Sequence, residues 1–388
     1  MPAIRRTGAL AALALTLVLG ACSTPADLDV PTLEPQFGGE YNDYGTDVSF
    51  YTSGRIFGLA EERSYSEYYD EYYDEYFGYS NDNIYLNRYD STGKLTWSKF
   101  VAGGYYSDYS GDGATAVPIG VSSDKNGVSY VFVSERDDRW SNEHENVVYK
   151  YDLSGNLIRT IYLDYLDAQG ASGAVDSVGN IYFANTDGSA GYVSKYTTAG
   201  TFIWKRALSV GITTDISVAS NGNIFVTGTT GVSRLSSSGS VAWTKVGAGD
   251  KVVASGTNVY VKNKATVRKL DVNGKQLWSK AQSSLSGIVV ADMTADASGN
   301  VYLTGKYSAS STNRNVFTRK LNSSGTAVFT KTFGTPAYDD ARGIATINGS
   351  EIYITGATQG SLAHSYRGGE NDGYLRKLSS TGNPVWTR

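Results

Sequence analysis

The sequence predicts an all-β fold of short antiparallel strands, and three observations support this prediction. Glycine and tyrosine are abundant, with 44 and 30 residues, and valine, isoleucine and threonine are frequent, a composition that favours strands joined by tight turns. Helical periodicity is nearly absent from the chain. Glycine-containing turns recur from end to end, which indicates repeated hairpins.

Two turn motifs alternate strictly along the chain. In the first, a turn rich in Ser and Asn ends in glycine and precedes a short alternating strand, as in "SNGNIFVTG" from Ser220. In the second, an aromatic residue follows the turn glycine four residues later, as Trp278 follows Gly274. The first motif falls at Gly54, Gly127, Gly179, Gly222, Gly256, Gly299 and Gly349, and the second at Gly93, Gly155, Gly200, Gly239, Gly274, Gly325 and Gly382.

Seven turns of each kind predict seven repeats of two hairpins, because glycine supplies the positive φ that tight turns need. A four-stranded unit repeated seven times predicts a seven-bladed β-propeller of four-stranded antiparallel blades, whose radial closure leaves only short edges. The alternative is a two-sheet sandwich. The expected blades span residues 37–102, 103–165, 166–208, 209–247, 248–283, 284–333 and 334–388.

The periodic aromatic residue is expected on the outer strand, packed between neighbouring blades. Blade two lacks it, because Arg159 stands four residues after Gly155, so this blade is expected to pack through Ile158 or Ile161. Two modes of ring closure fit the sequence: simple packing of blade seven on blade one, or an additional edge strand from Pro35 to Gly39.

The N-terminus has the layout of an export signal: Arg5 and Arg6, then an apolar run from Ala9 to Leu19. "LGAC" resembles the lipobox of bacterial lipoproteins, which implies a signal peptide over residues 1–21 and lipid, including palmitate, on Cys22. The residues after it contain three prolines and suit an extended tether over 22–36. Ser23 follows the cysteine where the inner-membrane retention signal has Asp, which favours the outer membrane of the cell envelope. The alternative is a stray thiol in a cleaved signal; Cys22 is the one cysteine, so no intramolecular disulfide forms.

Three segments carry a family resemblance. "FGGEYNDYGTDV" at Phe37, "FGTPAYDDARGIATINGSEIYITGATQG" at Phe333 and "GGENDGYLRKLSSTGNPVWTR" at Gly368 resemble the SBBP repeats of bacterial β-propellers. "DVNGKQLWSK" and "DSTGKLTWSK" are also similar to PQQ-type repeats of the lipoprotein in the outer-membrane barrel-assembly machine. The resemblance implies a propeller and fixes no chemistry, since propellers host many unrelated functions.

The loops between the second and third strands of a blade are longest in blades seven, one and two, which ring closure makes neighbours. Segments Ser134–Asn146, Gly356–Asp372 and Gly103–Gly113 are therefore expected beside the long loop of blade one. Long loops on a rigid scaffold are the usual carriers of binding residues. The formal charge of −4 over the whole chain argues against a nucleic-acid partner.

The blade-one loop contains "EYYDEYYDEYFGY", whose spacing predicts a short amphipathic helix with tyrosines on one side and carboxylates on the other. Residues Glu61 to Asp82 hold eight acidic residues and one basic residue, Arg63. Tyrosine offers a large, stiff contact with a polar tip. The alternative is that the rings pack on the propeller while the acids face water. The predicted binding residues are Tyr65, Glu67, Tyr68, Tyr69, Asp70, Glu71, Tyr72, Tyr73, Asp74, Glu75, Tyr76, Tyr79, Tyr105, Tyr106 and Tyr109.

Residues for catalysis or metal binding are few. His144 and His364 are weak candidate ligands, and no HExxH or close His pair accompanies them. "DKNG" at Asp124 and "DVNG" at Asp271 resemble calcium loops, but hairpin geometry explains them better. No GxSxG motif is present. We expect no catalytic residue and no cofactor, with Ca²⁺ as the alternative.

The predicted function is a non-catalytic lipoprotein of the cell envelope, anchored to the membrane through its lipid alone. It would bind or scaffold a protein or envelope polymer through the tyrosine-rich acidic face. Two alternatives remain: an accessory lipoprotein of outer-membrane protein assembly, and a metal-dependent or redox-active envelope protein that uses the tyrosine cluster.

Overall fold

The computed structural model describes residues 42–51, 55–70, 75–107, 113–137, 144–163, 171–187, 190–282, 287–308, 314–362 and 370–388. All of them belong to one compact unit, Pro35–Arg388. The predicted signal peptide, Cys22 and the tether lie outside the described residues. Within the described ranges the chain forms strands and turns, and no helix long and apolar enough to cross a membrane is present there.

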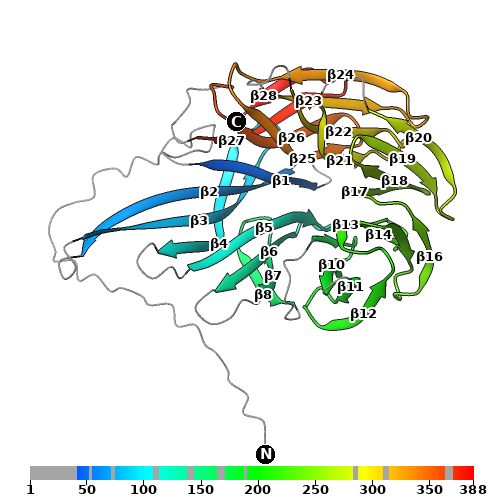
Figure 1. The fold of residues 1–388 in the computed structure, drawn as a ribbon, viewed down its shortest axis with the longest axis horizontal. Helices are drawn as coiled ribbons and strands as arrows, with labels where there is room; N and C mark the ends of the chain where they lie inside the picture. The colour runs from blue at the N-terminus through cyan, green and yellow to red at the C-terminus, as the bar shows by residue number, and fades with distance from the viewer. Residues whose placement is uncertain are drawn as a thin grey trace, which may run out of the picture. The chain divides into compact units, whose positions relative to one another are not determined.

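In the described ranges, twenty-eight strands make seven blades in chain order (Figure 1). Blades one to four are β1 (Asp43–Tyr51), β2 (Arg55–Asp70), β3 (Glu75–Tyr89), β4 (Leu95–Ser107); β5 (Gly113–Ser123), β6 (Ser129–Asp137), β7 (His144–Tyr151), β8 (Leu157–Tyr162); β9 (Ser172–Val175), β10 (Ile181–Asp187), β11 (Ala190–Tyr196), β12 (Phe202–Leu208); and β13 (Thr213–Val218), β14 (Ile224–Gly228), β15 (Gly231–Leu235), β16 (Val241–Val246). Blades five to seven are β17 (Lys251–Ser255), β18 (Asn258–Asn263), β19 (Thr266–Asp271), β20 (Gln276–Ala281); β21 (Val289–Ala295), β22 (Val301–Ser308), β23 (Arg314–Leu321), β24 (Ala327–Phe333); and β25 (Asp339–Ile347), β26 (Glu351–Thr358), β27 (Asp372–Ser379), β28 (Pro384–Thr387).

The predicted all-β, seven-bladed propeller is confirmed. Each blade is an antiparallel meander, with its first strand near the ring axis and its fourth strand outermost. The predicted turn glycines join the first strand to the second and the third to the fourth. Gly54 lies outside the described residues, and the other thirteen have φ between +58° and +85°, the left-handed region that other residues adopt only with strain.

The ring closes by packing of blade seven on blade one. β1 lies against β25, β26 and β27, and Val48, Tyr353 and Leu375 share one buried apolar cluster. The Asp43 amide donates to the Asn371 carbonyl oxygen at 2.7 Å. Simple packing is therefore what the described residues show; Pro35–Gly39 lies outside them.

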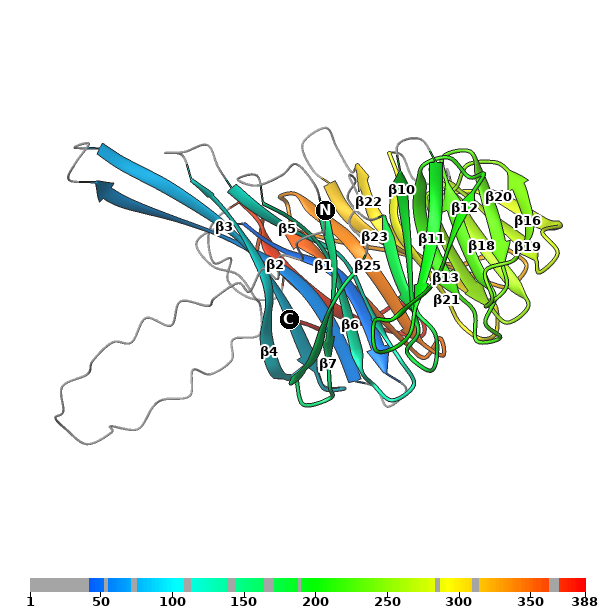
Figure 2. The same cartoon turned by 90° about the horizontal axis from the view of Figure 1, so that it is seen from below.

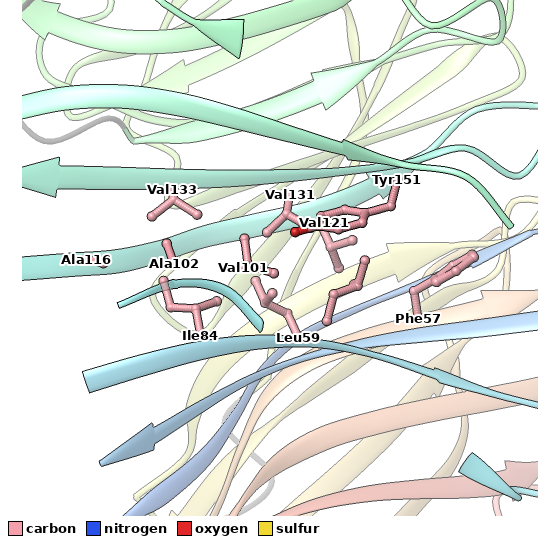
Figure 3. Close-up of a cluster of buried hydrophobic side chains, with 11 residues drawn as sticks. Phe57, Leu59, Ile84, Val101, Ala102, Ala116, Val121, Val131, Val133 and Tyr151 are labelled. Carbon is pink, nitrogen blue, oxygen red and sulfur yellow. The ribbon is translucent and has the colours of Figure 1, made fainter. Parts of the chain in front are cut away.

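The core is a series of apolar layers between adjacent blades. Figure 3 shows the layer between blades one and two, in which side chains such as Leu59, Ile84, Val121 and Val131 interdigitate. Second strands are buried on both faces in mid-blade, as Ile181–Ala184 of β10 shows, because each blade is covered by a neighbour on either side. This explains their continuous apolar sequence.

Blade one departs from the regular pattern. β4 continues past the expected border at residue 102 to Ser107 and pairs with β5, so blades one and two form one eight-stranded sheet. β2 and β3 are the longest strands of the described chain, with 16 and 15 residues. Their far ends project well beyond the other blades (Figures 1 and 2).

Candidate functional site

The tyrosine-rich segment forms a β-hairpin, so the predicted amphipathic helix is wrong. β2 and β3 pair in unbroken antiparallel register from Ile56↔Tyr89 to Asp70↔Glu75. Tyr and Phe favour strands. Both strands also continue strands of blade one that are already paired with each other, so the same pairing extends into this segment. We name residues 63–82 the arm. Tyr65, Glu67, Tyr68, Tyr69 and Asp70 lie on its β2 side and Glu75, Tyr76 and Tyr79 on its β3 side, whereas Glu71, Tyr72, Tyr73 and Asp74 lie outside the described residues.

Neighbouring strands end before the arm does. β1 pairs with β2 as far as Glu62, and β4 pairs with β3 as far as Tyr79. Beyond these points the arm is a two-stranded ribbon, in which Tyr69 lies opposite Tyr76. Both of its outer backbone edges lack a paired strand within the described chain, and such edges can accept a strand from another molecule.

The other predicted tyrosines separate into two groups. Tyr105 and Tyr106 lie opposite Asn81 and Ser80, and Tyr65 lies opposite Ser80 from the other side. The structure thus brings the backbone of Tyr105 and Tyr106 beside the base of the arm. Tyr109 lies outside the described residues.

Charged side chains fix the base of the arm to the ring. Arg63 reaches Glu61 at 3.1 Å and Asp82, on the opposite strand, at 3.2 Å. The Arg63 guanidinium also lies 5.5 Å from the centre of the Tyr44 ring, and Arg342 of blade seven lies 4.1 Å from the same ring. Both contacts have cation–π geometry, so blade seven and the arm share Tyr44.

The segments expected beside the arm are its neighbours in the ring. Asn371, in the long loop of blade seven, donates through Nδ2 to Asn42 Oδ1 at 3.2 Å and to Tyr44 Oη at 3.3 Å, immediately before and within β1. On the other side β5, β6 and β7 continue the sheet from β4, with Arg136 opposite His144. The described parts of the blade-seven loop and of β4 to β7 therefore lie in the same sector as the base of the arm, whereas the secondary structure expected for the arm is wrong.

The candidate metal ligands do not come together among the described residues. His144 begins β7, and His364 lies outside the described ranges. No group of three potential ligands is found in the part of the chain that the structure describes. Asp124 and Asp271 accept amide hydrogens of their own turns, Asp124 from Asn126 at 2.8 Å and Asp271 from Asn273 at 2.9 Å, so these turns have hairpin geometry.

Asp339, the first of the two aspartates of the "FGTPAYDD" segment, is fully buried and stabilises the loop that enters blade seven. Its Oδ2 accepts the Thr335 amide at 2.6 Å, and its Oδ1 accepts the Thr358 hydroxyl at 2.5 Å. Asp43 occupies the matching place in "FGGEYNDYG" and is also buried. The aspartate shared by these segments is therefore structural. An open depression of about 470 Å³ lies beside it, lined by Gly334, Thr335, Pro336, Ala337, Gly360 and Ser361.

The periodic tryptophans contact the next blade, as expected, and a cation that the sequence analysis missed joins them. Trp243 Nε1 donates to the Val272 carbonyl oxygen at 2.8 Å, and Arg234 from the adjacent strand donates to the same oxygen at 3.1 Å. In blade two Ile161 takes the place of the tryptophan, because it is 4% exposed and lies against Gly200, whereas Ile158 is 48% exposed. The signal for the cation was present in the sequence. Six third strands carry a Lys or Arg opposite the aromatic residue of the fourth strand, and in blade two the corresponding Lys150 lies opposite Arg159: the six are Arg88, Lys195, Arg234, Lys269, Lys320 and Lys377.

A second set of cations lies on the outer strands, at the same junctions. Arg206 Nε donates to the Gly239 carbonyl oxygen of the next blade at 2.9 Å, and a Cβ on Gly274 would lie 2.7 Å from Lys245 Cε. Each junction has one such residue. We call this set the basic rim: Lys99, Arg159, Arg206, Lys245, Lys280, Lys331 and Arg388.

Near the ring axis, four charged residues from four blades form an axial cluster. Asp47, Asp215 and Asp292 each follow a β-bulge and accept a backbone N–H from the next blade, donated by Val121, Val252 and Ile344 at 2.8, 2.8 and 2.9 Å. Lys251 lies 3.7 Å from Asp292.

The axial charges shift one another's pKa. Burial, together with the Asp292 carboxylate, raises the pKa of Asp47 to about 7. Burial also raises the pKa of Asp215, whereas Asp215 and the other carboxylates raise the pKa of Lys251. The cluster therefore holds blades together through a charge balance that depends on protonation.

Comparison with known proteins supports the fold and adds no function. No protein-family model and no curated protein matches the chain. Among solved structures, the WD40 β-propeller domain of Doa1 is 11% identical, with a TM-score of 0.52, over 88% of this chain and 94% of that one. A protein of unknown function from Bacteroides caccae is 12% identical, with a TM-score of 0.44, over 66% of this chain and 93% of that one. At 11% identity the likeness to the Doa1 domain concerns the fold alone.

Proposed function

We propose that this chain is a non-catalytic lipoprotein of the cell envelope that captures a basic partner with the arm of its propeller. The observation that carries the proposal is the arm itself, a two-stranded ribbon that leaves the ring and concentrates tyrosines and carboxylates at its far end. A rigid scaffold that presents a projecting element is the usual arrangement of a binding module.

Charge and residue type support a basic protein as the partner. The eight acidic residues from Glu61 to Asp82 face one basic residue, Arg63, and Arg63 is already paired with Glu61 and Asp82. Tyrosine is enriched at hot spots of protein interfaces because its ring buries much area at a small entropy cost. The lipid anchor at Cys22 rests on the "LGAC" segment, and placement at the outer membrane rests on Ser23 after the cysteine; both belong to this proposal.

Removal of the arm tests the proposal. Replacing Ser64–Asn81 by a two-residue Asn-Gly turn keeps the Arg63↔Asp82 pair that closes the base. We expect this variant to fold, with an unchanged melting temperature, and to lose capture of a polylysine-coated surface and of envelope proteins by pull-down. A matched control exchanges Glu67, Asp70, Glu71, Asp74 and Glu75 for Gln or Asn and keeps every tyrosine. Capture that survives in both variants contradicts the proposed function.

A further inference from the structure

We infer that Asn348 is a site of spontaneous modification, at which asparagine converts to aspartate or isoaspartate without an enzyme. Glycine after asparagine favours this reaction, because glycine has no side chain to hinder the approach of its backbone nitrogen. The sequence contains four such pairs, and the asparagine is exposed in each of them: Asn126, Asn221, Asn273 and Asn348. The four pairs therefore share one sequence feature, and a backbone hydrogen bond separates the last from the other three.

In three of these turns the glycine N–H is already used. It donates to the carbonyl oxygen of the residue three positions earlier, over 2.9–3.0 Å, in the turns of Gly127, Gly222 and Gly274. This bond holds the amide proton and directs the nitrogen into the turn, so it has to open before the nitrogen can react. The folded chain therefore protects the asparagines that precede these three glycines.

The turn at Asn348 is built differently. Asn348 and Gly349 both have left-handed φ, +49° and +72°, as in a type I′ turn. The hydrogen bond that closes this turn comes from the following residue, because the Ser350 N–H donates to the Ile347 carbonyl oxygen at 2.9 Å. Among the described residues the Gly349 N–H has no hydrogen-bond acceptor. The nitrogen that has to react is therefore free in the folded chain.

The reaction consumes only water. The Gly349 nitrogen loses its proton and attacks Asn348 Cγ, the bond from Cγ to Nδ2 breaks, and ammonia leaves with the proton. The product is a cyclic succinimide. Water then opens the ring at one of its two carbonyl groups: attack at Cγ leaves aspartate, and attack at the main-chain carbonyl leaves isoaspartate. Water enters and ammonia leaves, so no oxidant or reductant takes part.

The modified turn would no longer fit blade six. Gly349 is buried, and a Cβ added to it would lie 2.5 Å from Asp296 Oδ2 and 2.7 Å from Tyr302 Oη. Isoaspartate takes the main chain through its side-chain Cβ and so lengthens a turn that has no spare room on this side. Either product also adds a negative charge directly before the glycine that contacts the Asp296 carboxylate. We therefore expect conversion of Asn348 to weaken the junction between blades six and seven.

The test compares deamidation rates in the folded and the unfolded chain. The full chain is incubated at mildly alkaline pH, without denaturant and in concentrated urea, and each Asn-Gly pair is followed by peptide mapping with mass spectrometry. In the folded chain we expect Asn348 to convert at least about fivefold faster than the other three asparagines, because only those three require a backbone hydrogen bond to open. In urea, where these bonds are absent, the four rates should converge.

Two results overturn the inference. One is a folded chain in which Asn348 converts no faster than the other three asparagines. The other is an Asn348 that reacts faster than they do by the same factor in urea, because the preference would then come from the flanking sequence and not from the turn.

The variants Asn348→Gln and Asn126→Gln test the effect on the junction, since glutamine would close a larger ring and reacts far more slowly. Each variant is compared before and after incubation, so that any loss of stability caused by the substitution itself cancels. Incubation should lower the melting temperature of the wild type and of Asn126→Gln by about 2 °C or more and leave that of Asn348→Gln unchanged. An equal loss in both variants would overturn the assignment to Asn348.

Discussion

At the scale of single residues, the seven turns between third and fourth strands are glycine for two separable reasons. Gly239 has φ +83°, and a Cβ there would lie 2.8 Å from Trp204 Cδ2 of the preceding blade. Gly222, in the turn between the first and second strands of blade four, has nearly the same backbone, φ +79°, but the nearest neighbour of a Cβ there would be Ser237 Cβ at 3.5 Å. The pair separates backbone strain from contact with the tryptophan.

We expect Gly222→Ala to lower the free energy of unfolding by about 1–2 kcal/mol, the cost of the left-handed conformation alone. Gly239→Ala should lower the free energy of unfolding by about 1–3 kcal/mol more than Gly222→Ala does, because the Trp204 ring must move. Urea denaturation followed by tryptophan fluorescence measures both values. Equal losses in the two variants would show that the tryptophan yields without cost.

Asp47 predicts a specific dependence of stability on pH. Its pKa of about 7 in the folded state exceeds its ordinary value of 3.8, so between these limits the folded chain keeps a proton that the unfolded chain has released. Its contribution to stability is therefore complete below about pH 4, falls as the pH rises toward 7, and is constant above. Partial access of Asp47 to solvent moderates the size of the effect.

Asp47→Asn should remove this contribution, because the amide does not titrate. The wild-type free energy of unfolding minus that of the variant should then decrease between pH 4 and 7 and level off at higher pH. Denaturation curves at several pH values give this difference directly, and the shared titration of Asp215 and Asp339 largely cancels in it. A difference that is constant from pH 4 to 8 would contradict the axial assignment.

At the scale of structural elements, the arm is the part of the sheet with the least lateral support. In β2, Ile56–Ala60 pairs with β1 on one side and β3 on the other, whereas Glu67–Asp70 pairs with β3 alone. Local stability follows such differences in pairing and burial.

We predict that hydrogen exchange of the monomeric chain, at high salt, shows strong protection for Ile56–Ala60 and much faster exchange for Glu67–Asp70 and Glu75–Gly78. Mass spectrometry of peptic peptides resolves these segments. Uniform protection along β2 at high salt would show that the arm is covered within a single copy.

The elements also show how far the sequence could lead. The glycine turns predicted every described blade because each turn requires a positive φ at one residue. This requirement is local, so it selects glycine at a position that the sequence alone reveals. The arm was mistaken for a helix because tyrosines at positions such as Tyr68, Tyr69, Tyr72 and Tyr73 satisfy helical spacing. Pairing with the rest of blade one, which local spacing does not report, decides for a strand. The axial cluster draws Asp47, Asp215, Lys251 and Asp292 from four blades, so no local pattern signals it.

At the scale of the whole molecule, one junction differs from the other six, because blades seven and one are not consecutive in the chain. Trp386 Nε1 donates to the Ser91 carbonyl oxygen at 3.4 Å, and Arg388 Nε donates to Gly93 at 2.9 Å. Trp243 makes the equivalent contact between blades four and five, which are also joined by a short connection. Noncovalent contacts alone hold the closing junction.

We expect Trp243→Ala to cost about 2–4 kcal/mol through lost packing and a lost hydrogen bond. Trp386→Ala should cost more and should also open the ring locally, with faster hydrogen exchange in β1 and β27 at denaturant concentrations that leave other blades intact. Thermal melts and exchange measurements compare the two variants. Identical exchange patterns would mean that the closing junction is no weaker than the others.

The whole-molecule view also changes the meaning of the net charge. A value of −4 over the chain argued against a nucleic-acid partner, but that sum includes eight acidic residues and one basic residue between Glu61 and Asp82, so the rest of the chain is net positive. Because exposed charges act over about 10 Å at moderate salt, a partner responds to one surface at a time. The absence of nucleic-acid binding therefore stays a prediction, because the net charge alone does not describe the surface outside the arm.

The junctions between blades all have the same structure, so the ring consists of equivalent repeats. Each blade contributes two contact residues. Its outer-strand aromatic residue or isoleucine packs on the next blade, and its turn glycine contacts the corresponding side chain of the preceding blade. This contact has the same pattern at all seven junctions, and every blade carries both types of contact residue. Duplication or loss of a whole blade would therefore preserve the contact at every junction. The number of blades could then change during evolution without a new type of interface.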